Sequence, residues 1–130
     1  MIVDSSVLIA ILQSEPGFEA YEAAISMSRR KRISAATYAE VGVVAARKRG
    51  AAGLAVIRDM VEQLGLEVVS LDIEQAETAQ DAFVDFGKGR HPARLNFGDC
   101  FAYALAKTES APLLFKGDDF AKTDISAVKT

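Results

Sequence analysis

Short strand-like runs alternate with longer helical runs along the whole chain, and this alternation constrains the fold more than any other feature. Strands are predicted at residues 2–3, 32–35, 67–71 and 112–115. Helices of about 10 to 15 residues between strands act as crossovers, which favour a mostly parallel sheet. The sequence therefore predicts one α/β domain over residues 1–130, with a mostly parallel central sheet flanked by helices.

The segments between the strands carry the 3.6-residue apolar spacing of amphipathic helices. Helices are predicted at residues 7–12, 18–28, 37–49, 54–64, 73–86 and 97–107. Glycine and proline mark the breaks at Pro16-Gly17, from Gly50 to Gly53, and in the loop from Gly87 to Pro92.

The bulk composition is that of a single folded domain. Half of the 130 residues are apolar and a quarter are charged. The only cysteine, Cys100, has no partner for an internal disulfide, which predicts a cytoplasmic protein, and we assign it to the core. No apolar run reaches the length of a membrane span, and the apolar opening predicts a first strand rather than a signal peptide.

The charge is distributed unevenly. A net charge of −3 argues against a general nucleic-acid binder, yet residues 29–49 hold seven basic side chains against the single acid Glu40. A smaller basic group comprises Lys88, Arg90 and Arg94. Two interpretations stay open: local binding of phosphate groups, or solvated helix ends.

Acidic residues recur where predicted strands end. Asp4 follows the first strand, Glu40 lies one turn into the helix after the second, Asp99 begins the helix before the last strand, and Asp118 and Asp119 follow that strand. Ligands of open parallel sheets bind at the carboxyl edge, so these acids should converge. Carboxylates in one cleft repel each other unless a cation lies between them. Oxygen ligands without histidine or cysteine favour Mg²⁺ or Mn²⁺.

Each acid also has a purely structural interpretation. Asp4 precedes a helix and could cap it. Thr37 and Glu40 have the spacing of a capping box, as do Asn96 and Asp99. The acidic pair after the last strand could belong to a simple turn. These alternatives stay open for each residue taken singly, while the recurrence of acids at one edge of the sheet favours a site.

Four segments resemble the motifs of one known family in the same order and spacing. Residues 1–10 resemble the opening of a PIN domain, residues 33–41 are similar to its second motif, residues 96–106 to its third, and residues 113–120 to its fourth. The resemblance points to the VapC toxins of type II toxin–antitoxin systems. It implies a magnesium-dependent endoribonuclease that forms a homodimer and is neutralised by a VapB antitoxin.

The resemblance also implies roles for individual residues. Asp4 and Asp99 would hold the metal ion directly, with Glu40 and Asp118 acting through water or completing a second site. Ser6 would orient Asp4 or a water molecule, or would only cap its helix.

The fourth motif departs from the family pattern. The family commonly has Asp-x-Asp-Phe, with its first aspartate in the site, and here that position is Gly117. Either Asp118 or Asp119 must then supply the fourth carboxylate, or three acids suffice. We favour Asp118.

Substrate and partner contacts are predicted from neighbouring segments. Lys88, Arg90 and Arg94 lie just before Asp99 in the chain and are expected to meet substrate phosphate. In contrast, His91 is interpreted as incidental. The apolar stretches at residues 7–12 and 41–46 could contact an antitoxin segment, or could belong to the core.

Two other functions are consistent with parts of the sequence. A PIN fold that binds partners without catalysis is suggested by Gly117. A receiver-like phosphoacceptor domain would also carry an acidic magnesium pocket, and Lys116 fits it, but Ser5-Ser6 stand after Asp4 where a receiver places paired acids.

Overall fold

The computed structural model describes residues 1–130 and confirms an α/β fold with a parallel sheet. Its elements are β1 (Ile2–Val3), α1 (Ser5–Leu12), α2 (Phe18–Met27), β2 (Arg32–Ser34), α3 (Ala35–Gln63), β3 (Glu67–Val69), α4 (Ile73–Phe86), α5 (Phe97–Thr108), β4 (Leu113–Leu114) and the 3₁₀ turn η1 (Phe120–Lys122). The predicted strands and helices are all present, and only η1 was not expected.

The sheet has the order β3-β2-β1-β4, and all three strand pairs are parallel. β1 lies centrally, with Ile2 opposite Arg32 of β2 and Val3 opposite Leu114 of β4. The chain winds from β1 towards β3 on one side and returns to β4 on the other. Such a reversal opens a crevice at the carboxyl ends of the two strands beside it, which here are β1 and β4.

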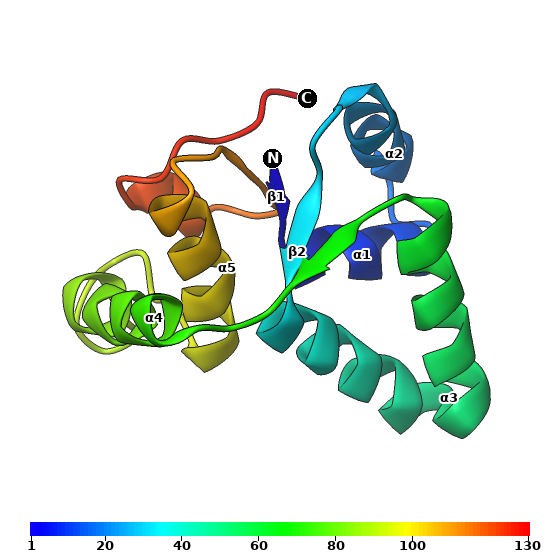
Figure 1. Cartoon of the computed structure of the whole chain (residues 1–130), viewed down its shortest axis with the longest axis horizontal. Helices are drawn as coiled ribbons and strands as arrows, with labels where there is room; N and C mark the ends of the chain where they lie inside the picture. Colours follow the sequence, from blue (N-terminus) through cyan, green and yellow to red (C-terminus); the bar gives the residue numbers. More distant parts are fainter.

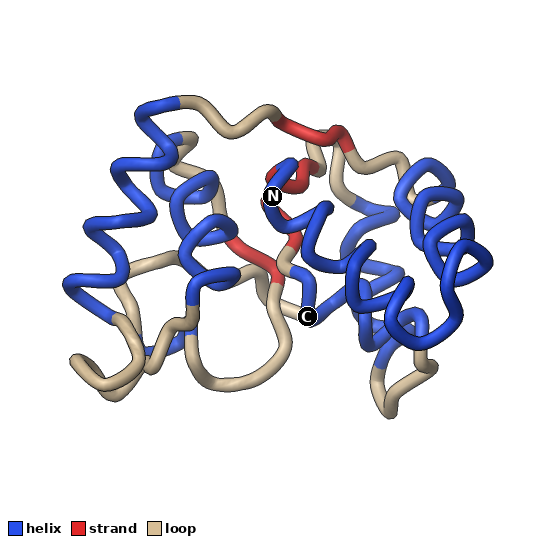
Figure 2. The backbone as a smooth tube through the Cα atoms, turned by 90° about the horizontal axis from the view of Figure 1, so that it is seen from below, coloured by secondary structure: helices blue, strands red, loops and turns tan.

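Alternate side chains of the short strands enter two separate cores. Ile2 and Leu113 belong to a core shared with α4 and α5. Val3 and Leu114 belong to a second core shared with α1, α2 and α3. Figure 1 shows these two groups of helices on opposite sides of the strands, and Figure 2 shows the strands running between them.

The break predicted between two helices is a sharp kink within α3. Arg49 and Gly50 leave the helical conformation, and Gly50 has a φ of 58°, in the left-handed region that favours glycine. Gly53 lies so close to the backbone of Ala45 that a Cβ atom there would clash with its carbonyl group. The two halves of α3 therefore approach closely at the kink and diverge from it, as Figure 1 shows at the lower right.

Burial decides between the alternatives left open for several apolar residues. Val7, Leu8 and Val41 are fully buried, so the two stretches considered for antitoxin contact belong mainly to the core. Val43 is an exception, with 52% of its surface exposed. Cys100 is buried in the core beside α4, as predicted. No helix has the length and apolar character needed to cross a membrane.

Candidate active site

Asp4 stands at the carboxyl end of β1 and is almost fully buried. Its side chain caps α1 by accepting a hydrogen bond from the Ser6 amide at 3.0 Å. Burial raises the pKa of the Asp4 carboxyl, the contacts with Ser6 lower it, and the nearby charge of Glu40 raises it again. The capping interpretation of Asp4 is thus confirmed. Asp4 is also a buried acid whose pKa is raised by the charge of a second acid, Glu40.

Ser6 joins the first strand to the loop after the last one. Its hydroxyl oxygen accepts a hydrogen bond of 3.0 Å from the backbone amide of Lys116, and the same hydroxyl faces Asp4. Ser6 therefore orients Asp4 and also ties down the loop that continues into Asp118 and Asp119.

Asp99 caps the opposite helix. Asn96 and Asp99 form a reciprocal capping box, in which Asn96 accepts from the Asp99 amide at 2.8 Å and Asp99 accepts from the Asn96 amide at 3.0 Å. Burial raises the pKa of Asp99 to about 6, although the Asn96 hydrogen bond lowers it. The nearby charges of three further acids also raise it: Asp4, Asp119 and Glu40. Asp99 is therefore the residue at which the four acidic segments meet.

Glu40 is not used as a helix cap. α3 begins at Ala35, and Ser34 caps it by accepting from the Ala36 amide at 3.2 Å, so the predicted capping box of Thr37 and Glu40 does not form. The Glu40 carboxylate instead lies against Gly98 in the first turn of α5, beside Asp99. The structural alternative for Glu40 is wrong, and its carboxylate belongs to the acidic group.

The two acids after β4 differ in their environment. Asp119 is close enough to Asp99 to raise its pKa, whereas Asp118 is not among the main influences on that carboxyl. Both lie in the turn that follows Gly117, whose φ of 98° is in the left-handed region that favours glycine. The electrostatics thus group Asp119, rather than Asp118, with the other three acids.

The donor set suits a hard divalent cation. It consists only of carboxylate oxygens, and none of the main influences on Asp4 or Asp99 is a lysine or arginine. No three acidic, histidine or cysteine side chains yet lie close enough to enclose an ion. The acids therefore suit a divalent cation by their oxygen ligands and by the mutual repulsion that a cation would relieve. They do not form a complete set of ligands in this conformation.

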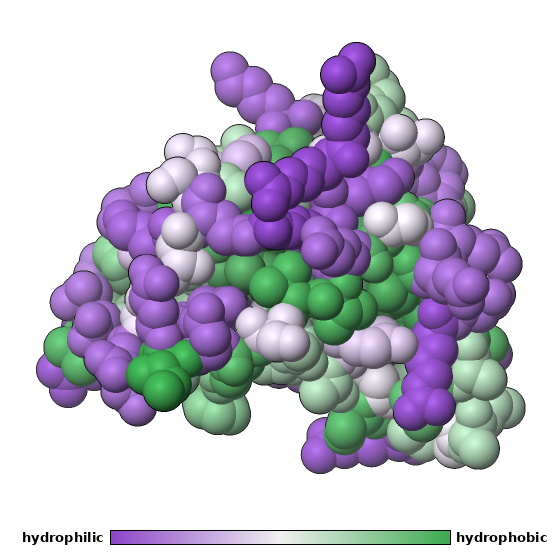
Figure 3. Space-filling model, in the orientation of Figure 1, coloured by the Kyte–Doolittle hydropathy of each residue, from purple (hydrophilic) through white to green (hydrophobic).

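A groove of about 690 Å³ opens beside these acids, between the first half of α3 and the start of α5. Glu40 and Arg47 line one wall, and Phe97 and Phe101 line the other. The space-filling view shows a hollow at the lower edge of the molecule, between the α4–α5 side and the α3 side (Figure 3). Phe97 is 78% exposed and packs edge-on against Phe101, with ring centroids 4.7 Å apart.

Arg47 is a residue of the site that was not predicted from the sequence. It stands seven residues after Glu40, which is two helical turns, so both side chains lie on the same face of α3. That spacing is visible in the sequence and would have identified Arg47 as the basic residue of this groove.

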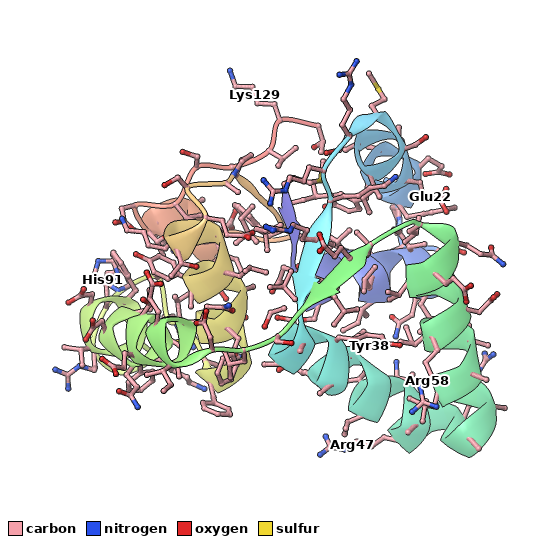
Figure 4. The ribbon with its side chains drawn as sticks, in the orientation of Figure 1. Glu22, Tyr38, Arg47, Arg58, His91 and Lys129 are labelled. Carbon is pink, nitrogen blue, oxygen red and sulfur yellow. The ribbon has the colours of Figure 1, made fainter.

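The predicted basic loop lies elsewhere. Figure 4 places His91 at the edge of the molecule beyond α4, far from Tyr38 and Arg47 of α3. The Arg90 side chain donates to the Val84 carbonyl at 3.1 Å, and His91 Nδ1 accepts from the Ala93 amide, so the loop is bonded to itself and to α4. Lys88 and Arg94 are exposed in the same loop, and no contact joins any of its basic residues to the acids.

Comparisons with known proteins agree with this geometry. The PIN domain family model matches residues 1–126. The chain is 41% identical over 128 residues to Ribonuclease VapC30 of Mycobacterium tuberculosis, covering 98% of each chain. It is also 41% identical to Ribonuclease VapC of Mycolicibacterium smegmatis, covering 98% of this chain and 99% of the other. The crystal structure of Mycobacterium tuberculosis VapC20, a Sarcin-Ricin loop cleaving toxin, has a similar fold, with a TM-score of 0.77 at 17% identity over 99% and 98% of the two chains.

Proposed function

Because the chain belongs to the PIN-domain family of VapC ribonucleases, we propose that it is the toxin of a toxin–antitoxin pair and hydrolyses RNA phosphodiester bonds with Mg²⁺. The observation that carries this proposal is the convergence of three acids from separate segments, Asp4, Glu40 and Asp119, on Asp99 at the β1–β4 crevice. Acids concentrated there without a basic partner favour metal-dependent phosphate chemistry over a binding role alone.

Each acid has a distinct task in this proposal. Asp4 and Asp99 would hold the cation, since a capping hydrogen bond fixes each carboxylate at the start of a helix. Glu40 and Asp119, whose charges both act on Asp99, would complete the site. When bound, Mg²⁺ or Mn²⁺ supplies Lewis acidity and neutralises charge that develops on the phosphate. Ser6 fixes the loop after β4 relative to the Asp4 carboxylate, because its hydroxyl accepts a hydrogen bond from the Lys116 amide.

The groove supplies the RNA contacts. Arg47 carries the positive charge for a phosphate group next to the acids. Phe97 offers an exposed aromatic ring, directly before Gly98 and Asp99, on which a base can stack. These two residues take the leading place in substrate binding, and Lys88, Arg90 and Arg94 remain secondary candidates for more distant phosphates.

Partners follow from the family and from the relatives. Among similar folds is VapBC2 from Rickettsia felis bound to a DNA fragment from their promoter, with a TM-score of 0.77 at 11% identity, covering 98% of this chain and 96% of the other. We expect a VapB-like antitoxin to cover the groove and to place an arginine against the acids, which lack a basic partner. We also expect the protein to be cytoplasmic and to form a homodimer. Light scattering of the purified toxin tests the homodimer directly.

The first experiment is cleavage of total bacterial RNA by purified protein free of antitoxin, with and without Mg²⁺. We expect discrete fragments that require the metal and are lost in Asp99→Asn. The matched control is Asp81→Asn, which removes an equal charge from the exposed surface of α4. A folded Asp99→Asn protein that cleaves at the wild-type rate would contradict the proposal.

A second pair of variants identifies the fourth acid. We expect Asp119→Asn to lower cleavage by about 10- to 100-fold, the usual effect of removing a supporting group at a metal site. In contrast, Asp118→Asn should stay within about twofold of wild type, because Asp118 is not among the main influences on the Asp99 carboxyl. The reverse order of effects would return the role to Asp118.

A further inference from the structure

The backbone conformation at position 98 does not require glycine. Gly98 stands second in α5, between Phe97 and Asp99, and its φ lies outside the left-handed region. Glycine in such a position lowers helix stability relative to alanine, because it has more conformational freedom to lose on folding. Another constraint must therefore favour the absence of a side chain.

The constraint is the Glu40 carboxylate. A Cβ atom at Gly98 would lie 2.6 Å from Glu40 Cδ and 2.9 Å from Glu40 Oε1, with Oε2 closer still. These separations are far inside van der Waals contact, so an alanine at this position and the present Glu40 conformation exclude each other. The carboxylate occupies the space that a side chain at Gly98 would fill.

Other glycines of the chain have different reasons to be there. Gly53 and Gly87 approach backbone carbonyl groups: a side chain at Gly53 would push the two halves of α3 apart, and one at Gly87 would meet the Phe83 carbonyl at the end of α4. Gly50 and Gly117 have positive φ and open space around them. Gly98 differs from both kinds, because the closest atoms all belong to the carboxylate of a proposed site residue.

We propose that Gly98 is a positioning residue: its missing side chain provides the space in which the Glu40 carboxylate lies, next to Asp99. This inference rests on the proposed function only in treating Glu40 as a metal-site acid; the spatial exclusion itself does not depend on it.

The surroundings of Glu40 explain why such a space matters. None of the ion pairs of the chain involves Glu40, so no cation fixes this long and flexible side chain. The first turn of α5 presents free amide groups and the positive end of the helix dipole, which attract a carboxylate. Gly98 lets the carboxylate approach this helix end despite the neighbouring charges of Asp4 and Asp99.

The proposal predicts coupling between the two positions in a double-mutant cycle of thermal stability. In the Glu40→Ala background the space is empty, so Gly98→Ala should raise Tm by about 3 °C through better helix propensity. In the wild-type background the Cβ atom must displace the Glu40 carboxylate, so Gly98→Ala should raise Tm by clearly less, or lower it. Glu40→Gln keeps the shape and removes the charge, so Gly98→Ala should have the same effect on Tm in that background as in wild type.

Metal binding gives the second readout. We expect Gly98→Ala to weaken Mn²⁺ binding by about tenfold in calorimetric titration, as expected when a metal-site group is displaced. In the Glu40→Ala background the same substitution should leave Mn²⁺ affinity unchanged. A structural defect unrelated to Glu40 would weaken binding in both backgrounds.

The outcomes separate this inference from the proposed function. An equal Tm shift from Gly98→Ala in the Glu40 and Glu40→Ala backgrounds would overturn the positioning role, even if RNA is cleaved. A Tm effect of Gly98→Ala that depends on Glu40, with no RNA cleavage by the wild-type protein, would support the positioning role and contradict the nuclease.

Discussion

The two ends of α5 hold acids in opposite electrostatic settings. At its start, Asp99 lies among Asp4, Glu40 and Asp119, and burial together with these charges raises its pKa. Near its end, Asp124 accepts a hydrogen bond from Tyr103 at 2.6 Å and pairs with Lys107 at 2.7 Å. These contacts, the Lys107 hydrogen bond first, hold the pKa of Asp124 below its ordinary value.

At the amino edge of the sheet, acids also have a basic partner, as Asp124 does. Arg32 at the start of β2 pairs with Glu67 at 3.0 Å and also with Glu109, directly after α5. Its side chain is only 12% exposed. Acids with basic partners therefore stabilise one edge, whereas acids without them gather at the other. Unpaired acids with a raised pKa are typical of functional sites, so this difference supports the proposed role of the second group.

The largest effect should come from replacing Asp4, which belongs to the unpaired acids near the start of α5, and the comparison is Asp124, whose partners are on α5. Asp4→Asn keeps a good helix cap but removes a metal ligand, so we expect cleavage to fall by at least about 10³-fold without loss of stability. Asp124→Asn should instead leave cleavage unchanged and lower the free energy of unfolding by at most about 1 kcal/mol, since its ion pair is half exposed. Cleavage assays and urea denaturation measure the two quantities. Activity that is lost in both variants would remove the distinction.

A second effect should be confined to stability. Arg32→Met leaves Glu109 without its cation, and the Glu109 Oε2 atom is already buried without a hydrogen-bond partner. We expect the free energy of unfolding to fall by about 2 kcal/mol, with normal cleavage per folded molecule. Glu67→Gln is the control: Glu67 is 66% exposed, so its loss should cost less than about 1 kcal/mol. Equal costs for the two variants would show that Glu109 does not depend on Arg32.

The smallest effect is a dependence of stability on pH. Because the pKa of Asp99 rises from 3.8 to about 6 on folding, the folded protein binds a proton that the unfolded chain releases in this interval. Metal-free protein should therefore become more stable, by a few degrees in Tm, as the pH falls from 7 to 5. Asp124, whose pKa is lowered, acts in the opposite sense at more acidic pH. Thermal melts of wild type and Asp99→Asn test this, and an identical slope in both would contradict the assignment.

Much of the fold was predictable, because apolar spacing and glycine positions are local. The strands, the helices and the break near Gly50 follow from them. The order of the strands could not be predicted in this way, since nothing local indicates that β1 pairs with β4. The convergence of the acids was inferred only from the general rule that parallel strands end at one edge.

The details of the site depend on geometry that the sequence does not carry. Turn conformation after Gly117 decides which of the two adjacent acids, Asp118 or Asp119, approaches Asp99. The capping interpretation of Glu40 failed because the helix starts at Ala35, one turn earlier than its spacing with Thr37 suggested. Nothing in the sequence indicated a role for Gly98, because Glu40, its neighbour in space, is 58 positions away along the chain.

The hydrogen bond between Ser6 and Lys116 has a consequence for synthesis of the protein. Its partners are 110 residues apart, so a ribosome adding 5 to 20 residues per second needs roughly 5 to 20 s to make the second after the first. Throughout that interval the nascent chain lacks β4, Asp119 and the amide that orients Ser6. The helices and β1 to β3 can form from what has emerged, but the acidic site is complete only when the last strand has been made and inserted beside the first.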